Sequence, residues 1–218
     1  RLQARATVER SVSKLKAVLY GEEDKAPKED QCDKLSKAWQ DHDVPLHMLH
    51  HIRVLGFEVR KDMSLCITAL TLNDTAGFRS VYLAGKPNIC RDLVDGYADS
   101  QTALAVGPML RACMKEPSLQ AAMLRLGGVL LELMRRHVHA PQFEVGADAF
   151  QSLQALLTTN PEEVRGFLVE KHDVFFEEYG AMLERANFST LRQALKLLGE
   201  LLLDRSHFEV MIRFVGAR

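Results

Sequence analysis

An internal repeat of a little over forty residues constrains the fold of this chain more than any other sequence feature. A shift of 45 residues lays segment 143–157 on segment 188–202 and matches the opening phenylalanine and three leucines of each. A shift of 86 residues, twice 43, lays segment 57–71 on segment 143–157, and both begin Phe-Glu-Val-x-x-Asp. The copy between them is fainter, with Val106, Leu110 and Cys113 in the apolar positions. Periods of this length are typical of HEAT and armadillo repeats, so we expect an all-α helical-repeat solenoid.

Composition agrees with a helical protein that has a continuous core. Hydrophobic residues make up 47% of the chain and charged residues 26%, and no segment alternates long enough to predict a strand. No linker rich in Pro, Gly or Ser divides the chain, so residues 1–218 are expected to form a single armadillo-like domain. Because the chain begins at Arg1 and stops at Arg218, just beyond an apolar segment, we expect it to be truncated at its C-terminal end.

Helices are expected wherever apolar residues recur at helical spacing. The predicted ranges are 4–20, 29–41, 44–55, 58–72, 87–97, 101–116, 118–137, 143–157, 161–169, 171–186, 190–204 and 206–215. Residues 21–30, GEEDKAPKED, are predicted to be a charged surface loop. Pro108 should kink or restart the helix over 101–116, because proline removes a backbone donor and clashes with the preceding turn.

The segment 190–205, TLRQALKLLGELLLDR, predicts a leucine-rich amphipathic helix. Thr190 and Gln193 have the spacing of a capping box. The expected apolar face is Leu191, Leu195, Leu198 and Leu202, and the expected polar face is Arg192, Gln193, Lys196 and Glu200. A cation in the first turn opposes the helix dipole, so Arg192 is either tolerated or available to bind an anion.

Charge and cysteine usage exclude several classes of function. The net charge of −1 and the sequence pI near 6.8 provide no field for nucleic acid or anionic membranes, so we expect neither as a partner. The four cysteines (Cys32, Cys66, Cys90 and Cys113) form no CxxC pair, and Cys66 and Cys113 occupy repeat-core positions as expected buried thiols. With neither a signal peptide nor an apolar span, this indicates a reducing, cytoplasmic setting.

Catalytic and metal-binding patterns are weak. His47, His50 and His51 form an HxxHH cluster. Two histidines three residues apart could share a helix face and bind a metal ion, but no cysteine or carboxylate pattern accompanies them. His137 and His139 flank a loop. Both groups of histidines are interpreted as ordinary polar surface residues and not as metal sites. Phosphate-binding, dinucleotide-binding, nucleophile-elbow and zincin motifs are missing from the sequence. We therefore expect a protein without catalytic residues, metal or cofactor.

The sequence resembles the mouse protein 25 scaffold family, also called the calcium-binding protein 39 family. The segments that carry the resemblance are 143–150, 175–179 and above all 192–205, preceded in the family's order by 19–21, 57–62 and 109–113. The resemblance covers nearly the whole chain and implies a non-catalytic, curved, horseshoe-shaped solenoid. It also implies a scaffold that binds and activates serine/threonine kinases of the sterile-twenty (germinal-centre) class in cell-polarity signalling.

The resemblance also implies the partners and their contact residues. The concave face would hold a kinase or pseudokinase domain, and a pocket would take the C-terminal Trp-Glu-Phe tail of a pseudokinase. Matched by position, the pocket residues are Phe143, Phe188, Arg192, Lys196, Arg205 and Phe208, with Phe188 where the family usually has tyrosine. An aromatic peptide needs an apolar slot, and its carboxylates need cations one helical turn apart.

Other interpretations of these residues remain open at this point. Phe143 and Phe188 occupy equivalent repeat positions and would also serve as plugs between repeats. Arg192 and Lys196 would also fit an ordinary solvated face, Phe208 core packing, and Arg205 the neutralisation of a helix C-terminus. The alternative functions are a generic helical-repeat adaptor for another protein, and an enzyme or zinc protein built on the histidine cluster.

Overall fold

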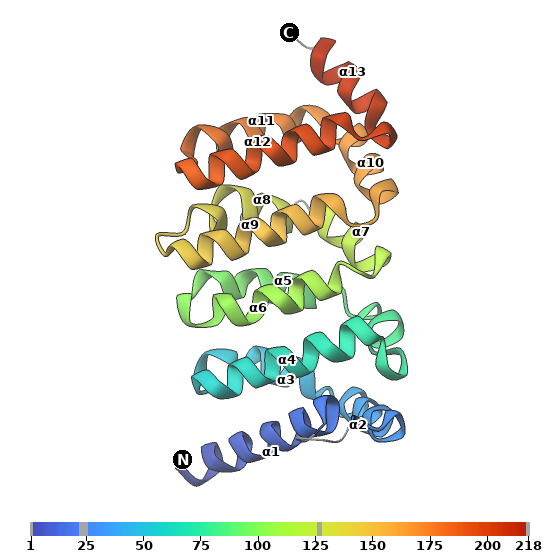
Figure 1. Ribbon diagram of the computed structural model, residues 1–218, viewed down its shortest axis with the longest axis vertical. Helices are drawn as coiled ribbons and strands as arrows, with labels where there is room; N and C mark the ends of the chain where they lie inside the picture. Colours follow the sequence, from blue (N-terminus) through green and yellow to red (C-terminus); the bar gives the residue numbers. More distant parts are fainter. Residues whose placement is uncertain (1, 22–25, 126–127, 217–218) are drawn as a thin grey trace. The chain divides into compact units, whose positions relative to one another are not determined.

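The computed structural model describes residues 2–21, 26–125 and 128–216, and this part of the chain is helical with no β-strand. Contacts divide it into two units, Arg1–Glu116 and Pro117–Arg218. The first unit contains α1 (Leu2–Tyr20), α2 (Glu29–Asp41), α3 (Val44–His50), η1 (Ile52–Val54), α4 (Phe57–Asn73), η2 (Thr75–Gly77), η3 (Phe78–Leu83), α5 (Ile89–Asp95), η4 (Gly96–Ala98) and α6 (Ser100–Cys113) (Figure 1). The second contains α7 (Pro117–Arg125), α8 (Gly128–Arg135), η5 (His137–His139), α9 (Phe143–Thr158), α10 (Pro161–Glu170), α11 (His172–Arg185), α12 (Phe188–Leu203), η6 (Arg205–His207) and α13 (Phe208–Gly216).

The helix starts confirm the predicted repeat and the all-α helical-repeat class. Helices α4, α6, α9 and α12 begin at residues 57, 100, 143 and 188, which are 43, 43 and 45 residues apart. Helices α9 and α12 are both 16 residues long and coincide end to end after the 45-residue shift. The apolar repeat in the sequence therefore marks one long helix per repeat.

Neighbouring repeats in the first unit are joined by polar side chains as well as by apolar packing. The Lys16 ammonium lies 2.7 Å from an Asp62 carboxylate oxygen, and the Tyr20 hydroxyl donates to the Leu65 carbonyl at 3.1 Å. The contact residues advance together along both helices, so α1 and α4 lie side by side and run in the same direction (Figure 1).

The second unit uses similar links. The Arg135 guanidinium of α8 pairs with the Glu178 carboxylate of α11, and Arg185 of α11 donates back to the Arg135 carbonyl at 3.2 Å. The buried Tyr179 hydroxyl of α11 donates to the Ala194 carbonyl of α12 at 2.8 Å. The two Arg135 contacts connect helices about one repeat apart in the sequence, whereas the Tyr179 bond joins the consecutive helices α11 and α12.

The buried core consists of the apolar faces of the long helices. Cys66 and Cys113 are buried as predicted, Cys90 is buried too, and Cys32 is half-buried. Burial raises the pKa of the Cys66 thiol to about 12, so this cysteine stays a thiol at neutral pH. None of the described helices combines the length and the apolar character needed to cross a bilayer.

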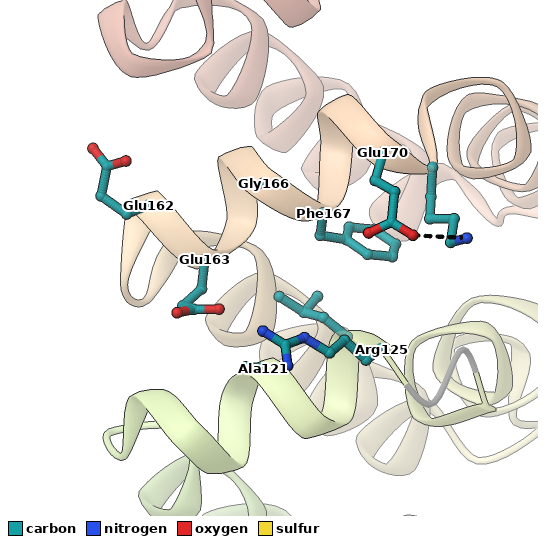
Figure 2. A pocket seen from close by; sticks show the side chains of 9 residues that line it. Ala121, Arg125, Glu162, Glu163, Gly166, Phe167 and Glu170 are labelled. Carbon is teal, nitrogen blue, oxygen red and sulfur yellow. Dashed lines mark ion pairs between the residues drawn. The ribbon is translucent and has the colours of Figure 1, made fainter.

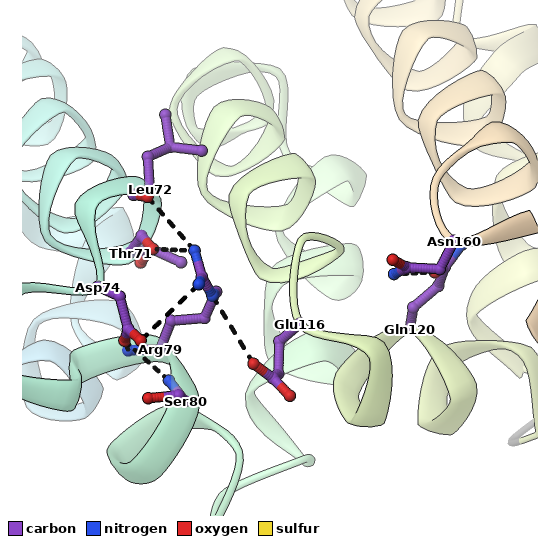
Figure 3. A network of polar contacts seen from close by, with 8 residues as sticks. All are labelled: Thr71, Leu72, Asp74, Arg79, Ser80, Glu116, Gln120 and Asn160. Atoms are coloured by element: carbon purple, nitrogen blue, oxygen red, sulfur yellow. Dashed lines mark hydrogen bonds and ion pairs between the residues drawn. The ribbon is translucent and has the colours of Figure 1, made fainter.

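In the first unit, Arg79 stabilises the C-terminal end of α4 (Figure 3). Its guanidinium donates to the carbonyls of Thr71 and Leu72 at 3.2 and 3.3 Å and lies 3.7 Å from carboxylate oxygens of Asp74 and Glu116. The last carbonyls of a helix have no partner inside the helix. Arg79 thus gives the Leu72 carbonyl a partner and adds a second donor to the Thr71 carbonyl, which also accepts from the Asp74 backbone N–H at 3.3 Å.

In the second unit, the side chain of Gln120 has a comparable role at the C-terminal end of α9 (Figure 3). Its buried amide donates to the Leu156 carbonyl at 2.7 Å and to the Thr159 carbonyl. Its oxygen accepts from the Asn160 side chain at 2.6 Å. An uncharged amide here satisfies carbonyls at the end of α9 and in the following turn.

Several predicted helix boundaries were wrong. The segment expected as one helix over 118–137 is described as α7 up to Arg125 and α8 from Gly128 to Arg135, followed by η5, with positions 126–127 outside the described residues. The helix expected over 44–55 ends at His50 and continues as η1, and the π-helical segment 78–83 was not predicted. Pro108 does not restart its helix, because α6 runs unbroken through it.

The charged loop predicted over 21–30 is shorter than expected. Residues 22–25 of it lie outside the described residues. Residues 26–28 are not helical, and α2 begins at Glu29, so the last two residues of the predicted loop are helical. Glu29 and Asp30 occupy the first turn of α2, where acidic side chains interact favourably with the helix dipole.

Candidate peptide-binding surface

Helix α12 carries three of the six residues expected to bind a peptide, and its start differs from the prediction. The helix begins at Phe188, and the Asn187 side chain accepts a hydrogen bond from the Thr190 backbone N–H at 2.9 Å. Asn187 is thus the N-cap, and the expected capping box of Thr190 and Gln193 is wrong. Thr190 lies inside the helix and is buried, since the N-cap is three residues earlier than the box would require.

The predicted inner face of α12 is also wrong, by about one residue. The buried residues are Thr190, Ala194, Leu197 and Leu201. Leu195 is exposed, and the other three leucines assigned to the core are half-buried. The helix has leucines around most of its circumference, so spacing alone could not select the face that packs inward.

The outward face of α12 combines apolar and basic side chains. Phe188 is 84% exposed and Leu203 is 79% exposed, with exposed Leu195 between them. Arg192 and Lys196 lie on the same side of the helix, one and two turns after Phe188, because residues four apart are neighbours on a helix. This face, defined here as the α12 surface, offers apolar contact area next to cations.

Arg192 and Lys196 differ in how far their charges are already engaged. The Lys196 ammonium lies 3.6 Å from a Glu200 carboxylate oxygen one turn later, and both side chains are largely exposed. Exposed pairs of this kind contribute little to stability and exchange readily for another anion. Arg192 is exposed, and its planar guanidinium can bind a carboxylate with two parallel hydrogen bonds.

The six expected residues fall into two groups. Phe143 and Phe188 open the neighbouring helices α9 and α12 at equivalent repeat positions, so they lie at the same end of the unit, together with Arg192 and Lys196. Arg205 and Phe208 follow the other end of α12, about 22 Å from Phe188 at 1.5 Å per residue. One small enclosed pocket cannot contain all six side chains in this structure.

The exposure of the three aromatic residues excludes the alternative interpretations as plugs between repeats or as core residues. Phe143 is 63% exposed and Phe208 is equally so, so neither these two nor Phe188 plugs a seam or packs in the core. Arg205 lies in η6, beyond the end of α12, and is exposed. Three large aromatic rings of this unit are therefore exposed to solvent.

Helix α13 adds a second apolar stripe at the far end of the α12 surface. Phe208, Ile212 and Val215 are exposed along one side of it. Arg213 fixes the helix, donating to an Asp173 carboxylate oxygen at 2.7 Å. The hydrogen bond from the His172 imidazole and the nearby Arg213 hold the pKa of Asp173 below its usual value.

Sequence reasoning missed the apolar members of this surface, chiefly Leu195, Leu203, Ile212 and Val215. Leu195 was assigned to the core, and the others were not considered as contacts. The available signal was the number of leucines in segment 190–205, which exceeds what one buried helix face can hold.

A separate cleft of the second unit lies between α7 and α10 and has a volume of about 520 Å³ (Figure 2). Glu163 and Glu170 approach it from α10 and Arg125 from α7, while Glu162 points away. The Glu170 carboxylate is engaged by Lys171 at 3.0 Å. The cleft is therefore a mixed-charge surface between two helices.

The histidine cluster does not converge on one point. The Nδ1 atoms of His47 and His51 lie 2.9 Å from the backbone carbonyls of Asp43 and His47, one turn earlier in the chain. His50 instead faces Asp92, with 3.5 Å between Nε2 and the carboxylate oxygen. The three rings thus have separate partners.

Comparison with known proteins identifies the family. The Mo25-like family model matches residues 1–218. The chain is 30% identical to the human protein named calcium-binding protein 39-like over 217 residues, which are 98% of this chain and 64% of the relative. It is 32% identical to MO25-like protein 2 of Caenorhabditis elegans over 202 residues, 91% of this chain and 59% of that protein. A putative MO25-like protein of Arabidopsis thaliana is 31% identical over 211 residues, with 95% and 61% covered.

The chain thus spans less than two thirds of the length of these relatives. The family-model match, the 43- to 45-residue helical repeat and the run of residues 192–205 agree with one another. This chain belongs to the Mo25-like family.

Proposed function

We propose that this chain is a non-catalytic scaffold that binds and activates serine/threonine kinases of the sterile-twenty class. Family membership supports the scaffold role. The proposed partners are kinase and pseudokinase domains and the Trp-Glu-Phe tail of a pseudokinase, in the cytoplasm. The four free cysteines fit that reducing compartment.

The observation that carries the proposal is the α12 surface. An aromatic-ended peptide requires exposed apolar area, which Phe188 and Leu195 offer, and cations for its glutamate and its terminal carboxylate, which Arg192 and Lys196 offer. Because these side chains project from one helix, the backbone loses little conformational entropy on binding, and the entropy cost is confined to the side chains. Arg205 and Phe208 would contact a more distant part of the same partner.

Fluorescence anisotropy with a labelled peptide ending in Trp-Glu-Phe tests the proposal. We expect saturable binding by the wild-type chain and at least tenfold weaker binding by Arg192→Glu, because removing one cation and adding an anion reverses the local charge. Lys37→Glu makes the same change in net charge on an exposed residue of the first unit and should bind like wild type. Equal binding by all three proteins would contradict the proposed site.

Activation requires its own measurement. A sterile-twenty-class kinase should phosphorylate a model substrate faster when the chain is added, and Arg192→Glu should reduce this effect if a tail-bearing pseudokinase is present. A folded chain that binds neither the peptide nor the kinase would instead be an adaptor for a different protein, and the kinase proposal would be wrong.

A further inference from the structure

A groove in the first unit, between α4 and α6, has a volume of about 410 Å³ and is lined by none of the residues in the proposed function. Its lining residues are Phe57, Arg60, Lys61, Ser64, Leu65, Ser100, Gln101, Leu104, Ala105 and Pro108. Phe57 is 68% exposed and Leu104 is 52% exposed, so large apolar side chains at the edge of the groove remain open to solvent. An exposed apolar groove of this size matches an aromatic side chain.

The two walls of the groove are held in place. Helices α4 and α6 pack directly against each other, and the buried Ser64 hydroxyl of α4 donates to the Ala105 carbonyl of α6 at 2.6 Å. Rigid helical walls preserve the shape of a binding site before the ligand arrives, which lowers the entropy lost on binding.

Arg60 adds a charge with incomplete hydrogen bonding to this groove. It is only 7% exposed, and one end nitrogen donates to the Leu55 carbonyl at 2.8 Å. Its Nε is buried and has no hydrogen-bond partner. Across the described part of the chain no carboxylate forms an ion pair with Arg60; Glu9 lies beside Gly56 without reaching Arg60, and Asp62 is engaged by Lys16. Because Arg60 is largely buried and makes no ion pair, an anion placed beside it gains more than it would on an open surface.

The repeat relates this groove to the α12 surface. Phe57 and Lys61 of α4 occupy the repeat positions of Phe188 and Arg192 of α12. Phe188 and Arg192 lie on an open face of α12, whereas Phe57 and Lys61 border a groove that also contains a buried arginine. The same aromatic-plus-cation pattern therefore appears twice, in two different surroundings.

We propose that the α4–α6 groove binds a segment of a partner protein that places an aromatic side chain beside an acidic side chain. The ring fills the apolar groove, the carboxylate pairs with the Arg60 guanidinium at the groove wall, and exposed Lys61 attracts the acidic segment. This site is additional to the proposed tail site, so either can fail without the other.

Two blocked tetrapeptides test the chemistry, acetyl-Gly-Phe-Glu-Gly-amide and acetyl-Gly-Phe-Gln-Gly-amide, titrated into the whole chain and followed by NMR. We expect the Glu peptide to shift signals of Leu104 and Ala105 saturably and to bind about tenfold more tightly than the Gln peptide, the difference expected when one charge-assisted hydrogen bond is lost. Shifts confined to other residues, no saturable shift, or equal affinities would overturn the proposal.

Three variants locate the site. Leu104→Glu should abolish the shifts, and Leu72→Glu, at a similarly exposed position on α4 outside the groove lining, should leave them unchanged. Arg60→Met keeps the aliphatic stem and removes the cation, so the preference for the Glu peptide should fall to about onefold, with folding checked by the melting temperature. If Leu104→Glu binds like wild type, the groove is not the site; this variant keeps the test decisive should Arg60→Met fail to fold.

Discussion

Helices α9 and α12 have the same length and the same place in the repeat, yet they bury different amounts of apolar surface. Phe150 of α9 is 1% exposed, and Leu195, which matches it after the 45-residue shift, is 52% exposed. Leu153 and Leu157 are fully buried, whereas their counterparts Leu198 and Leu202 are half-buried. A shared sequence pattern thus produces a core helix in one repeat and a helix with an apolar outer surface in the next.

The strongest test of this difference is to truncate the matched pair. Phe150→Ala should lower the free energy of unfolding by about 3–5 kcal/mol, because it leaves a cavity in a closed core. Leu195→Ala should change it by no more than about 0.5 kcal/mol, as expected for a residue already open to solvent. Urea unfolding of both variants measures the two values, and similar losses would mean that Leu195 is a core residue after all.

The C-terminal end of α9 provides the next largest effect. Gln120→Leu removes the donor that satisfies the Leu156 and Thr159 carbonyls and should cost about 1–3 kcal/mol, the range for leaving a buried polar group unpaired. Gln40→Leu in the first unit is a suitable control, since that amide donates to Ser36 and Ala76 from a half-buried position. We expect a smaller loss there, measured in the same way.

Glycines in the two helices should respond in opposite directions to the same substitution. A Cβ added to Gly199 of α12 meets nothing within 4 Å, so Gly199→Ala should stabilise the protein by about 0.5–1 kcal/mol through helix propensity. A Cβ on Gly146 of α9 would lie 3.2 Å from the Val138 carbonyl oxygen, a backbone atom that cannot rotate away. Gly146→Ala should therefore destabilise the protein. If thermal melting shows that both variants are more stable than wild type, the proposed difference in packing is wrong.

The smallest effect is the pH dependence of the link between α8 and α11. The hydrogen bond from Arg135 holds the pKa of Glu178 below its usual value. Stability from this pair is therefore present above the unfolded-state pKa of glutamate and is lost as the pH falls through the lower folded-state pKa. Glu178→Gln should be less stable than wild type at pH 7 and should approach it as the pH falls toward 3, measured by melting temperature; a constant difference would exclude the ion pair as the cause.

The sequence was sufficient for the fold class, because a 43- to 45-residue apolar period directly reports one long helix per repeat. The sequence did not show which face of α12 is buried. Leucines occupy several sides of this helix, and the buried side depends on the packing of α9 and α11. Thr190 and Gln193 matched a capping box by composition, whereas Asn187 provides the cap. Asn187, Ser189 and Thr190 are all suitable N-cap residues, so the sequence alone leaves the helix start uncertain by three residues.

For the candidate sites, too, the sequence predicted some features and not others. Resemblance identified Phe188, Arg192 and Lys196, and the structure places them on one exposed face. It did not separate them from Arg205 and Phe208, because distance along a helix becomes evident only when the helix ends are known. The α4–α6 groove was not predicted, since the burial of Arg60 depends on α6, more than thirty residues later.

The links between repeats have a consequence for folding kinetics. Lys16 and Asp62 are 46 residues apart, Tyr20 and Leu65 are 45 apart, and Arg135 and Glu178 are 43 apart. Loop closure over such a distance costs a similar amount of entropy each time, about 3 kcal/mol plus a constant, and the cost depends only weakly on the small differences in length. During synthesis on the ribosome, each of these contacts becomes possible as soon as the following repeat has emerged, without waiting for a distant partner in the sequence.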